Sequence, residues 1–282
     1  MTDPDQGYIL NTIQNPRSLK PVYESVNRDN TTDDEIVDDT GLSAAAVDEG
    51  AKGLQRLGLL DSKDEEYTVR DYTWSTGDET LDFQLTALEH LASSLTPPDW
   101  GKQAVIHLNY AYLIKEDYQR INDNDEAVRK QMDRWERDTL EYYPTYRGDR
   151  IDLNPNKMEN WGRLATYLGL LHQYETHEFT VYPDPSLIYH SIKRAHDAAG
   201  RTVDGNPVVE VPTYLDWLSN NLLYLPNNTG GVPAILSRSL YQLMSEERIR
   251  LAEIGDQGAV AFDRMPTHDR REQSANSIII TS

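Results

Sequence analysis

The chain has no cysteine and only 3 phenylalanines among its 282 residues. The absence of cysteine excludes disulfides, thiol chemistry and cysteine-ligated zinc. No apolar run approaches the roughly 20 residues that are needed to span a bilayer. The first ten residues, MTDPDQGYIL, also lack the charged and apolar regions of a signal peptide. We therefore expect a cytoplasmic protein without a membrane-spanning segment.

Basic residues are scarce, and lysine is scarcer than arginine. Asp and Glu number 47 against 27 Lys and Arg, which gives a net charge of −20, and only 8 of the basic residues are lysines. This composition resembles that of proteins from halophilic archaea, whose molar salt shortens the Debye length to about 3 Å. Under such screening a negative net charge does not exclude a nucleic-acid partner. An ordinary acidic protein from a low-salt cytoplasm is the alternative.

Motifs for catalysis and metal binding are missing. No two of the 7 histidines have the HExxH spacing, and the sequence has neither a Gly-rich phosphate loop nor a GxSxG motif. His172, His177 and Glu178 would meet around a metal only if a turn lay between them. His196-Asp197 resembles the paired ligands of HD-type phosphohydrolases, but the other ligands of that family cannot be placed. We therefore expect a protein that is not an enzyme and needs no metal or cofactor.

Residues 31–69 have the clearest local pattern in the chain. Thr32 or Asp33 can cap a first helix that Gly41 ends, and Ser43 can cap a second helix. In the second helix the apolar positions recur at three- and four-residue spacing: Val47, Gly50 or Ala51, Leu54 and Leu57. Gly58 ends this helix, and two short strands then flank a polar loop. The order of two helices and a hairpin resembles a winged helix-turn-helix, a fold used mainly to bind DNA.

The resemblance implies that the second helix enters the major groove. The DNA contacts it predicts are Ser43, Lys52, Gln55 and Arg56. Asp48 and Glu49 are expected on the same outward face, where they would oppose phosphates. A winged helix that binds proteins is therefore the alternative for this segment.

The C-terminal residues 231–282 are almost neutral, with 6 basic and 7 acidic side chains. Pro233 suits the start of a helix with a buried leucine stripe, and the segments IRLAEI, GDQG and AVAF predict a β-hairpin. We interpret residues 185–266 as a second, degenerate winged helix, followed by a tail over residues 267–282. The predicted DNA contacts in this region are Arg238, Ser239, Gln242, Arg248, Arg250 and Arg264. The alternative is a helical hairpin whose arginines pair with neighbouring acids.

Residues 76–184 predict a helical body between these two regions. Four apolar stripes indicate helices, the first at Leu81, Leu85, Leu88 and Leu91, and the last at Trp161, Leu164, Leu168 and Leu171. Tyrosines and tryptophans lie along these helices: Trp100, Tyr110, Tyr112, Trp135, Tyr142, Tyr143 and Trp161. Such rings can stack on exposed bases, but with so few phenylalanines we expect most of them in the core.

The sequence therefore predicts a mainly α protein with small β-wings, of the α+β class, with domains at residues 1–75, 76–184 and 185–266. The expected function is non-enzymatic binding of double-stranded DNA, as a transcription regulator or as the DNA-engaging subunit of a larger complex. The layout is similar to accessory subunits of prokaryotic DNA-modification and restriction islands, which act in defence. One alternative is a scaffold whose winged helices bind protein partners or form a homodimer. Another is a ligand-sensing regulator with its pocket in the helical body.

Overall fold

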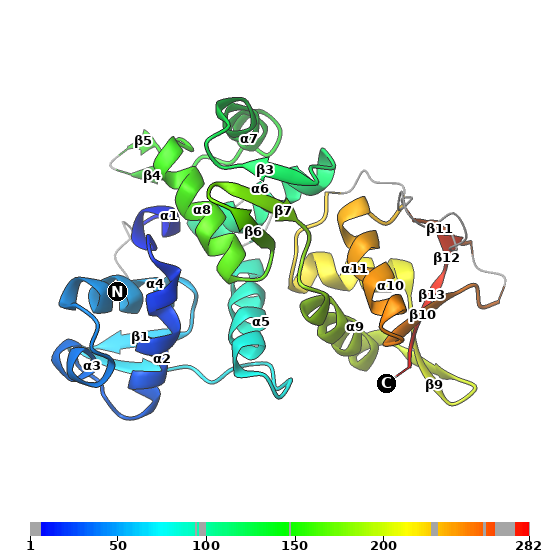
Figure 1. The fold of residues 1–282 in the computed structure, drawn as a ribbon, viewed down its shortest axis with the longest axis horizontal. Coiled ribbons are helices and arrows are strands. Elements are labelled where there is room, and N and C mark those ends of the chain that lie inside the picture. The colour runs from blue at the N-terminus through cyan, green and yellow to red at the C-terminus, as the bar shows by residue number, and fades with distance from the viewer. Residues whose placement is uncertain are drawn as a thin grey trace.

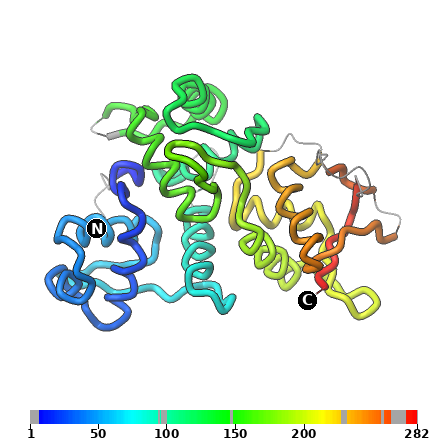
Figure 2. The backbone as a smooth tube through the Cα atoms, viewed as in Figure 1, coloured from blue at the N-terminus to red at the C-terminus, as the bar shows by residue number. Residues whose placement is uncertain are grey.

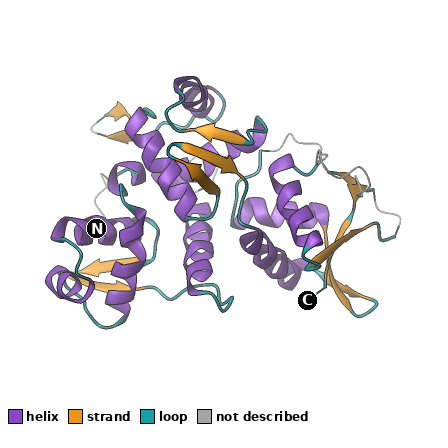
Figure 3. Cartoon of the chain, viewed as in Figure 1, coloured by secondary structure: helices purple, strands orange, loops and turns teal. Residues whose placement is uncertain are grey.

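The structure is a computed structural model that describes residues 7–93, 95, 100–146, 148–226, 231–255, 258–262 and 274–281. These residues form a mixed fold of helices and small antiparallel sheets, in agreement with the α+β class at that level. Three units follow one another along the chain, from the blue end through the green centre to the red end (Figure 2). Each unit has its own small group of strands (Figure 3).

The first unit combines helices with one hairpin, β1–β2. Its elements are α1 (Ile9–Thr12), the 3-10 helix η1 (Pro16–Ser18), α2 (Leu19–Asn27), α3 (Asp33–Thr40), α4 (Ala44–Arg56), β1 (Leu60–Lys63) and β2 (Glu66–Val69). The two turn residues of the hairpin, Asp64 and Glu65, both have positive φ angles. Two such residues give the tight turn that matches the twist of paired strands.

The helix caps expected in residues 31–69 are confirmed. Thr32 and Glu35 form a reciprocal capping box at the start of α3, which satisfies main-chain N–H groups that have no partner inside the helix. Gly41 ends α3 with a φ of +68°, and the Ser43 hydroxyl accepts a hydrogen bond from the N–H of Ala46 at 3.3 Å. The predicted stripe on α4 is buried.

The second unit follows a long connecting helix, α5 (Glu79–Ala92). Its elements are η2 (Lys102–Ala104), α6 (Val105–Lys115), β3 (Arg120–Asn122), α7 (Glu126–Asp138), β4 (Thr145–Tyr146), β5 (Asp149–Arg150), α8 (Pro155–Tyr167), β6 (Leu171–Glu175) and β7 (Glu178–Val181). Helix α6 is buried on every side from Val105 to Ile114. It forms the centre of this unit.

The helical body predicted for residues 76–184 has its helices, but it also contains strands that were not predicted, because β3, β6 and β7 form a three-stranded sheet. Leu171 was expected on the last helix but begins β6. The helix ends at Tyr167, and Gly169 turns the chain with a φ of +75°, a conformation that glycine adopts without strain. The expected core role of the aromatic residues is confirmed for Tyr110, Tyr112, Trp135, Tyr142 and Trp161, whereas Tyr143 is 55% exposed.

The third unit has the largest sheet. Its elements are α9 (Pro185–Ala199), β8 (Arg201–Val203), β9 (Asn206–Glu210), α10 (Val211–Asn221), α11 (Ala234–Ser245), β10 (Ile249–Ala252), β11 (Val260–Ala261), β12 (Ser274–Ala275) and β13 (Ser277–Ile280). The four-stranded sheet has the order β10-β13-β9-β8. Its buried residues include Ile249, Leu251 and Ile278.

Two expectations for this region are wrong. Strand β10 does not pair with the AVAF segment; it pairs with β13, so that Ile249 lies opposite Ile280. Val260 pairs instead with Ala275 of β12. Residues 274–281, which were assigned to a tail, therefore belong to this unit, and β13 lies between β10 and β9.

Apart from the hairpin β4–β5 in the second unit and strands β8, β11 and β12 in the third, these two units share one chain order, which is helix, strand, helix, helix and two strands. In both sheets the last of these strands lies between the other two: the orders are β3-β7-β6 and β10-β13-β9. The first unit has the same order with its first strand reduced to Thr31, whose carbonyl accepts a hydrogen bond of 2.8 Å from the N–H of Tyr67 on β2. One topology thus occurs three times along the chain.

The three units share one continuous apolar core. Helix α5 packs against α6 of the second unit and against α9 and α10 of the third, and it lies between them in Figure 1. At the other side of the second unit, α1 lies against both α4 and α8. The short N-terminal segment is thus placed between the first and second units.

Candidate nucleic-acid interface

Helices α4, α8 and α11 occupy the same place in the three units, as the second helix of each pair that precedes the final strands. Most of the predicted DNA contacts lie on α4 and α11. Their exposure and bonding therefore decide which of them are free to meet a ligand.

On α4 the predicted contacts are largely occupied. The Lys52 ammonium lies 2.7 Å from the Asp48 carboxylate, and both side chains are exposed. Ser43 serves as the helix cap. Gln55 is half-buried, and so is Arg56, whose pKa is lowered by burial.

Glu49 was expected to point outward from α4, and this is wrong. It is half-buried, and its Oε1 accepts hydrogen bonds from the N–H groups of Gln14 and Asn15 at 2.6 and 2.5 Å. The carboxylate therefore holds the loop before η1 and does not oppose a ligand. The exposed face of α4 retains the neutral pair of Lys52 and Asp48.

The corresponding face of α8 is covered by the N-terminal segment. The buried Asn160 side chain donates a hydrogen bond of 2.9 Å to the carbonyl of Leu10, and Arg163 donates one of 3.4 Å to the carbonyl of Gln14. The N-terminal segment therefore occupies the part of this face that holds Asn160 and Arg163. Helix α8 instead joins the first and second units.

On α11 one predicted contact is wrong. Ser239 is 1% exposed, and its hydroxyl donates to the carbonyl of Pro183 at 3.0 Å. It lies on the inner side of the helix. Arg238 is half-buried, and Gln242 is exposed and donates to Glu246 at 3.0 Å.

The chain after β10 covers another part of α11. The N–H of Val232 donates to the carbonyl of Ala261 at 2.9 Å, and the Phe262 ring packs against Tyr241 with centroids 6.2 Å apart. Both rings are buried. This contact leaves Arg238 and Gln242 as the members of the predicted set that reach the surface of α11.

Arg248 and Arg250 differ in their surroundings. The Arg248 guanidinium lies over the Tyr189 ring of α9, 3.7 Å from its centroid, and 3.9 Å from the Glu246 carboxylate. Arg250 alternates with the buried Ile249 and Leu251, so its exposed side chain projects from the outer face of the sheet. Among the described residues it has no acidic partner. Arg264 lies outside the described residues.

Two basic residues of α9 belong near this region and were missed. The Lys193 ammonium lies 5.7 Å from the centroid of the Tyr189 ring, which Arg248 also contacts. Arg194 lies over the Trp74 ring at 4.9 Å. Both are exposed. The Lys-Arg pair one turn after Tyr189 was visible in the sequence, but no local pattern indicated that it lies near Arg248.

Charge near Tyr189 also acts on His190. Burial lowers the pKa of His190, and the nearby positive charges of Lys193 and Arg248 lower it further, while Asp82 and Asp78 oppose the shift. His190 is therefore neutral near pH 7. The positive potential here comes from Lys193 and Arg248.

The histidines that the sequence offered as metal ligands make other contacts. A turn does lie between His172 and His177, yet His172 stacks on Tyr182 and His177 bonds to Asp123 at 2.7 Å. His196 lies 3.4 Å from Asp197. No group of three His, Cys, Asp or Glu suited to a metal ion occurs in the described part of the chain.

No family model, curated protein or solved structure matches the chain. Within the described ranges, no helix has both the length and the apolar character required to cross a bilayer.

Proposed function

We propose that the chain is a DNA-binding protein with three winged helix-turn-helix units in series, and that the third unit makes the principal contact with double-stranded DNA. One observation carries the proposal: the order of helices and strands and the position of the last strand recur in each unit. That order is typical of winged helices, which act mainly on DNA. The second unit adds a copy that the sequence did not reveal.

The third unit is favoured because of its charge and exposure. It contains Arg250, which projects from the sheet without an acidic partner among the described residues, and the pair of Lys193 and Arg248 around Tyr189. The corresponding helix of the first unit presents a neutral Lys52–Asp48 pair. Phosphate contacts need free positive charge, which the third unit offers.

The test is a titration of the intact protein with a short duplex, followed by fluorescence anisotropy over a series of KCl concentrations up to molar. Combined replacement of Arg238, Arg248 and Arg250 by glutamine should weaken binding and reduce the slope of log K against log salt by about 0.9 for each phosphate that the protein no longer neutralises. The matched control is Arg134→Gln, which removes an exposed arginine of α7. Unchanged affinity in the triple variant, or no binding by the intact protein at any salt, would overturn the proposal.

A scaffold for protein partners is the second candidate, and the acidic hairpin tips favour it. The tip of β1–β2 presents the exposed Asp64 and Glu65, and that of β6–β7 presents the exposed Glu175. In addition, α8 already binds a protein segment along the side that would enter a groove. This candidate predicts a partner that co-purifies with the intact protein and with the triple arginine variant alike. Its loss on replacement of Asp48 by lysine would place the partner on α4.

A further inference from the structure

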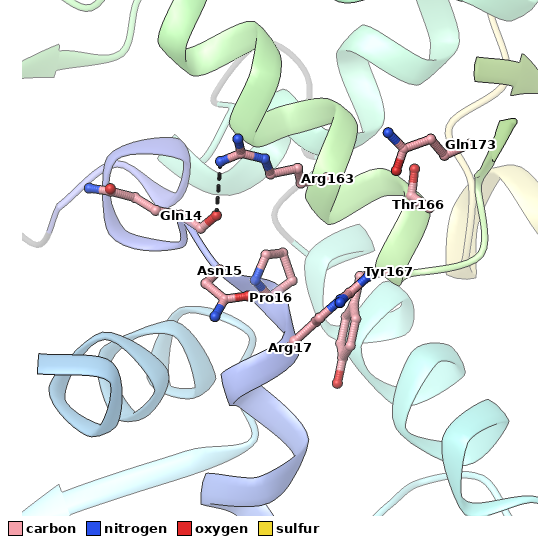
Figure 4. A pocket seen from close by; sticks show the side chains of 8 residues that line it. All are labelled: Gln14, Asn15, Pro16, Arg17, Arg163, Thr166, Tyr167 and Gln173. Atoms are coloured by element: carbon pink, nitrogen blue, oxygen red, sulfur yellow. Dashed lines mark hydrogen bonds between the residues drawn. The ribbon is translucent and has the colours of Figure 1, made fainter. Parts of the chain in front are cut away.

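A cleft of about 390 Å³ lies between the first and second units. One wall is the segment from Gln14 to Arg17, which leads into α2, and the other is formed by α8 and the start of β6. Figure 4 shows Arg163 directed toward Gln14 and Tyr167 beside Arg17, whereas Thr166 lies next to Gln173. The volume falls within the range of small-molecule sites. None of the predicted DNA contacts lines it.

The composition of the cleft is opposite to that of the protein. The chain has 47 acidic residues among 282, yet the cleft is lined by two arginines, three carboxamide side chains, Thr166, Tyr167 and Pro16, with no carboxylate. A lining of this kind favours an anion, because no carboxylate in it repels the ligand at short range.

Two carboxylates that contact the lining residues are already engaged. Glu49 accepts the N–H groups of Gln14 and Asn15, and Glu159 pairs with Arg163. Arg17 is exposed and has no acidic partner in the part of the chain that the structure describes. Its charge is therefore available to a ligand, and Arg163 offers the N–H groups that it does not use for Glu159 and Gln14.

We propose that this cleft binds a small phosphomonoester with a planar ring, of about mononucleotide size. Arginine suits the phosphate because its planar guanidinium pairs with two oxygens at once. The carboxamides of Asn15 and Gln173 offer both donors and acceptors for the polar edge of a ring. Tyr167 is half-buried and is held by an edge-on contact with Phe83, with centroids 5.8 Å apart, so it presents a fixed aromatic surface to the cleft, beside Arg17.

The site joins two units, which gives its ligand a structural consequence. Asn15 and Arg17 belong to the first unit, whereas Arg163, Tyr167 and Gln173 belong to the second. A bound ligand would add contacts across the junction that Asn160 and Leu10 already form. Binding should therefore raise the unfolding temperature of the intact protein.

The experiment is isothermal titration calorimetry of the intact protein in KCl, with thermal unfolding as a second readout. The probes are AMP, adenosine, inorganic phosphate and a short duplex DNA. We expect AMP to bind more tightly than phosphate or adenosine alone. Because chloride is present throughout, a response to AMP also shows that the cleft does not bind small anions without selectivity. No response to AMP, or a response equal to that of phosphate, would overturn the proposal.

Variants link the response to the cleft. Arg17→Gln removes an exposed charge and should weaken AMP binding by about tenfold or more, as for loss of a charge-assisted hydrogen bond. Arg163→Lys should weaken it as well, while Arg134→Gln on α7 should not. Unchanged binding in Arg17→Gln would overturn the assignment.

The duplex arm separates a free phosphomonoester from the phosphates of DNA. If duplex DNA displaces AMP and its affinity depends on Arg17, the cleft is part of the DNA surface and the small-molecule proposal fails. If AMP binds and the duplex does not displace it, the proposal stands, whatever the outcome of the DNA titration for the third unit.

Discussion

The side-chain amide of Asn160 on α8 donates a hydrogen bond of 2.9 Å to the main-chain carbonyl of Leu10, and both residues are buried. The two residues lie 150 positions apart in the sequence. This bond fixes the N-terminal segment on the helix that corresponds to α4 and α11 in the other units. It explains why α8 acts as a junction between the first and second units.

Replacement of Asn160 by alanine should therefore weaken the junction. The carbonyl of Leu10 would be left buried without a donor, which costs about 1–3 kcal/mol. Urea unfolding of the intact protein measures this loss. Asn156→Ala on the same helix is the control, because Asn156 is exposed, and it should change stability little. Equal effects of the two substitutions would contradict the role of the Asn160–Leu10 bond.

Ser239→Ala tests the corrected orientation of α11. Ser239 donates to the buried carbonyl of Pro183, so its loss should lower the free energy of unfolding by about 1–3 kcal/mol. DNA affinity should not change, since the side chain does not reach the surface. Gln242→Ala on the exposed face should leave stability almost unchanged. A loss of DNA affinity in Ser239→Ala, measured on protein that is still folded, would restore Ser239 as a contact.

Local signals in the sequence were sufficient for the helices of residues 31–69. The capping residues Thr32 and Ser43 and the left-handed glycine Gly41 act within a few positions of the chain, so their roles follow from spacing alone. The apolar stripes of α5 and α6 were visible for the same reason.

Strand pairing was not predictable in the same way. Ile278 pairs with Val209 and Leu251, and both partners are distant in sequence. A short apolar strand does not specify its partner locally. Strands β3 and β6 are short and partly exposed, so they lack the alternation that marks a half-buried strand. The copy of the topology in the second unit therefore emerged only from the fold.

The candidate sites were predictable only in part. Arg248 and Arg250 stood out as charges in a nearly neutral segment. The buried face of α11 was not predictable, because Ser239 on that face bonds to Pro183, which is distant in sequence. The cleft is assembled from Arg17 and Arg163, and no local pattern relates these two residues.

Gly58 offers a test of packing between α4 and α5. Its φ is +69°, and an added Cβ would overlap the imidazole ring of His90 on α5. Gly58→Ala should therefore destabilise the protein by more than the roughly 1 kcal/mol expected of a left-handed alanine alone. Gly77→Ala is the matched control, because Gly77 has a φ of +90° and open space around its Cα. Equal losses of unfolding temperature would show that the His90 ring moves aside without cost.

Glu136 should make the stability of the protein depend on pH. This carboxyl group is 1% exposed, and burial, followed by the repulsion of Asp133, raises its pKa from the ordinary value of 4.5 to about 8. Arg150 opposes the shift only weakly, because its guanidinium lies 4.0 Å from Glu136 and bonds to Asp133 and Asp152. Near pH 7 the folded protein therefore keeps the proton on Glu136, whereas the unfolded chain loses it.

The sign follows from this difference in bound protons. The folded state binds the extra proton between about pH 4.5 and about pH 8, so the contribution of Glu136 to stability falls as the pH rises through this window and is constant above it. Glu136→Gln cannot ionise and should remove the fall. In urea unfolding at constant KCl, the free energy of unfolding of the variant should rise relative to that of the wild type from about pH 5 to about pH 8. Glu65→Gln at the exposed hairpin tip is the control and should show no such trend. If the difference in unfolding free energy between Glu136→Gln and the wild type does not vary with pH, the Glu136 carboxyl group keeps its ordinary pKa in the folded protein.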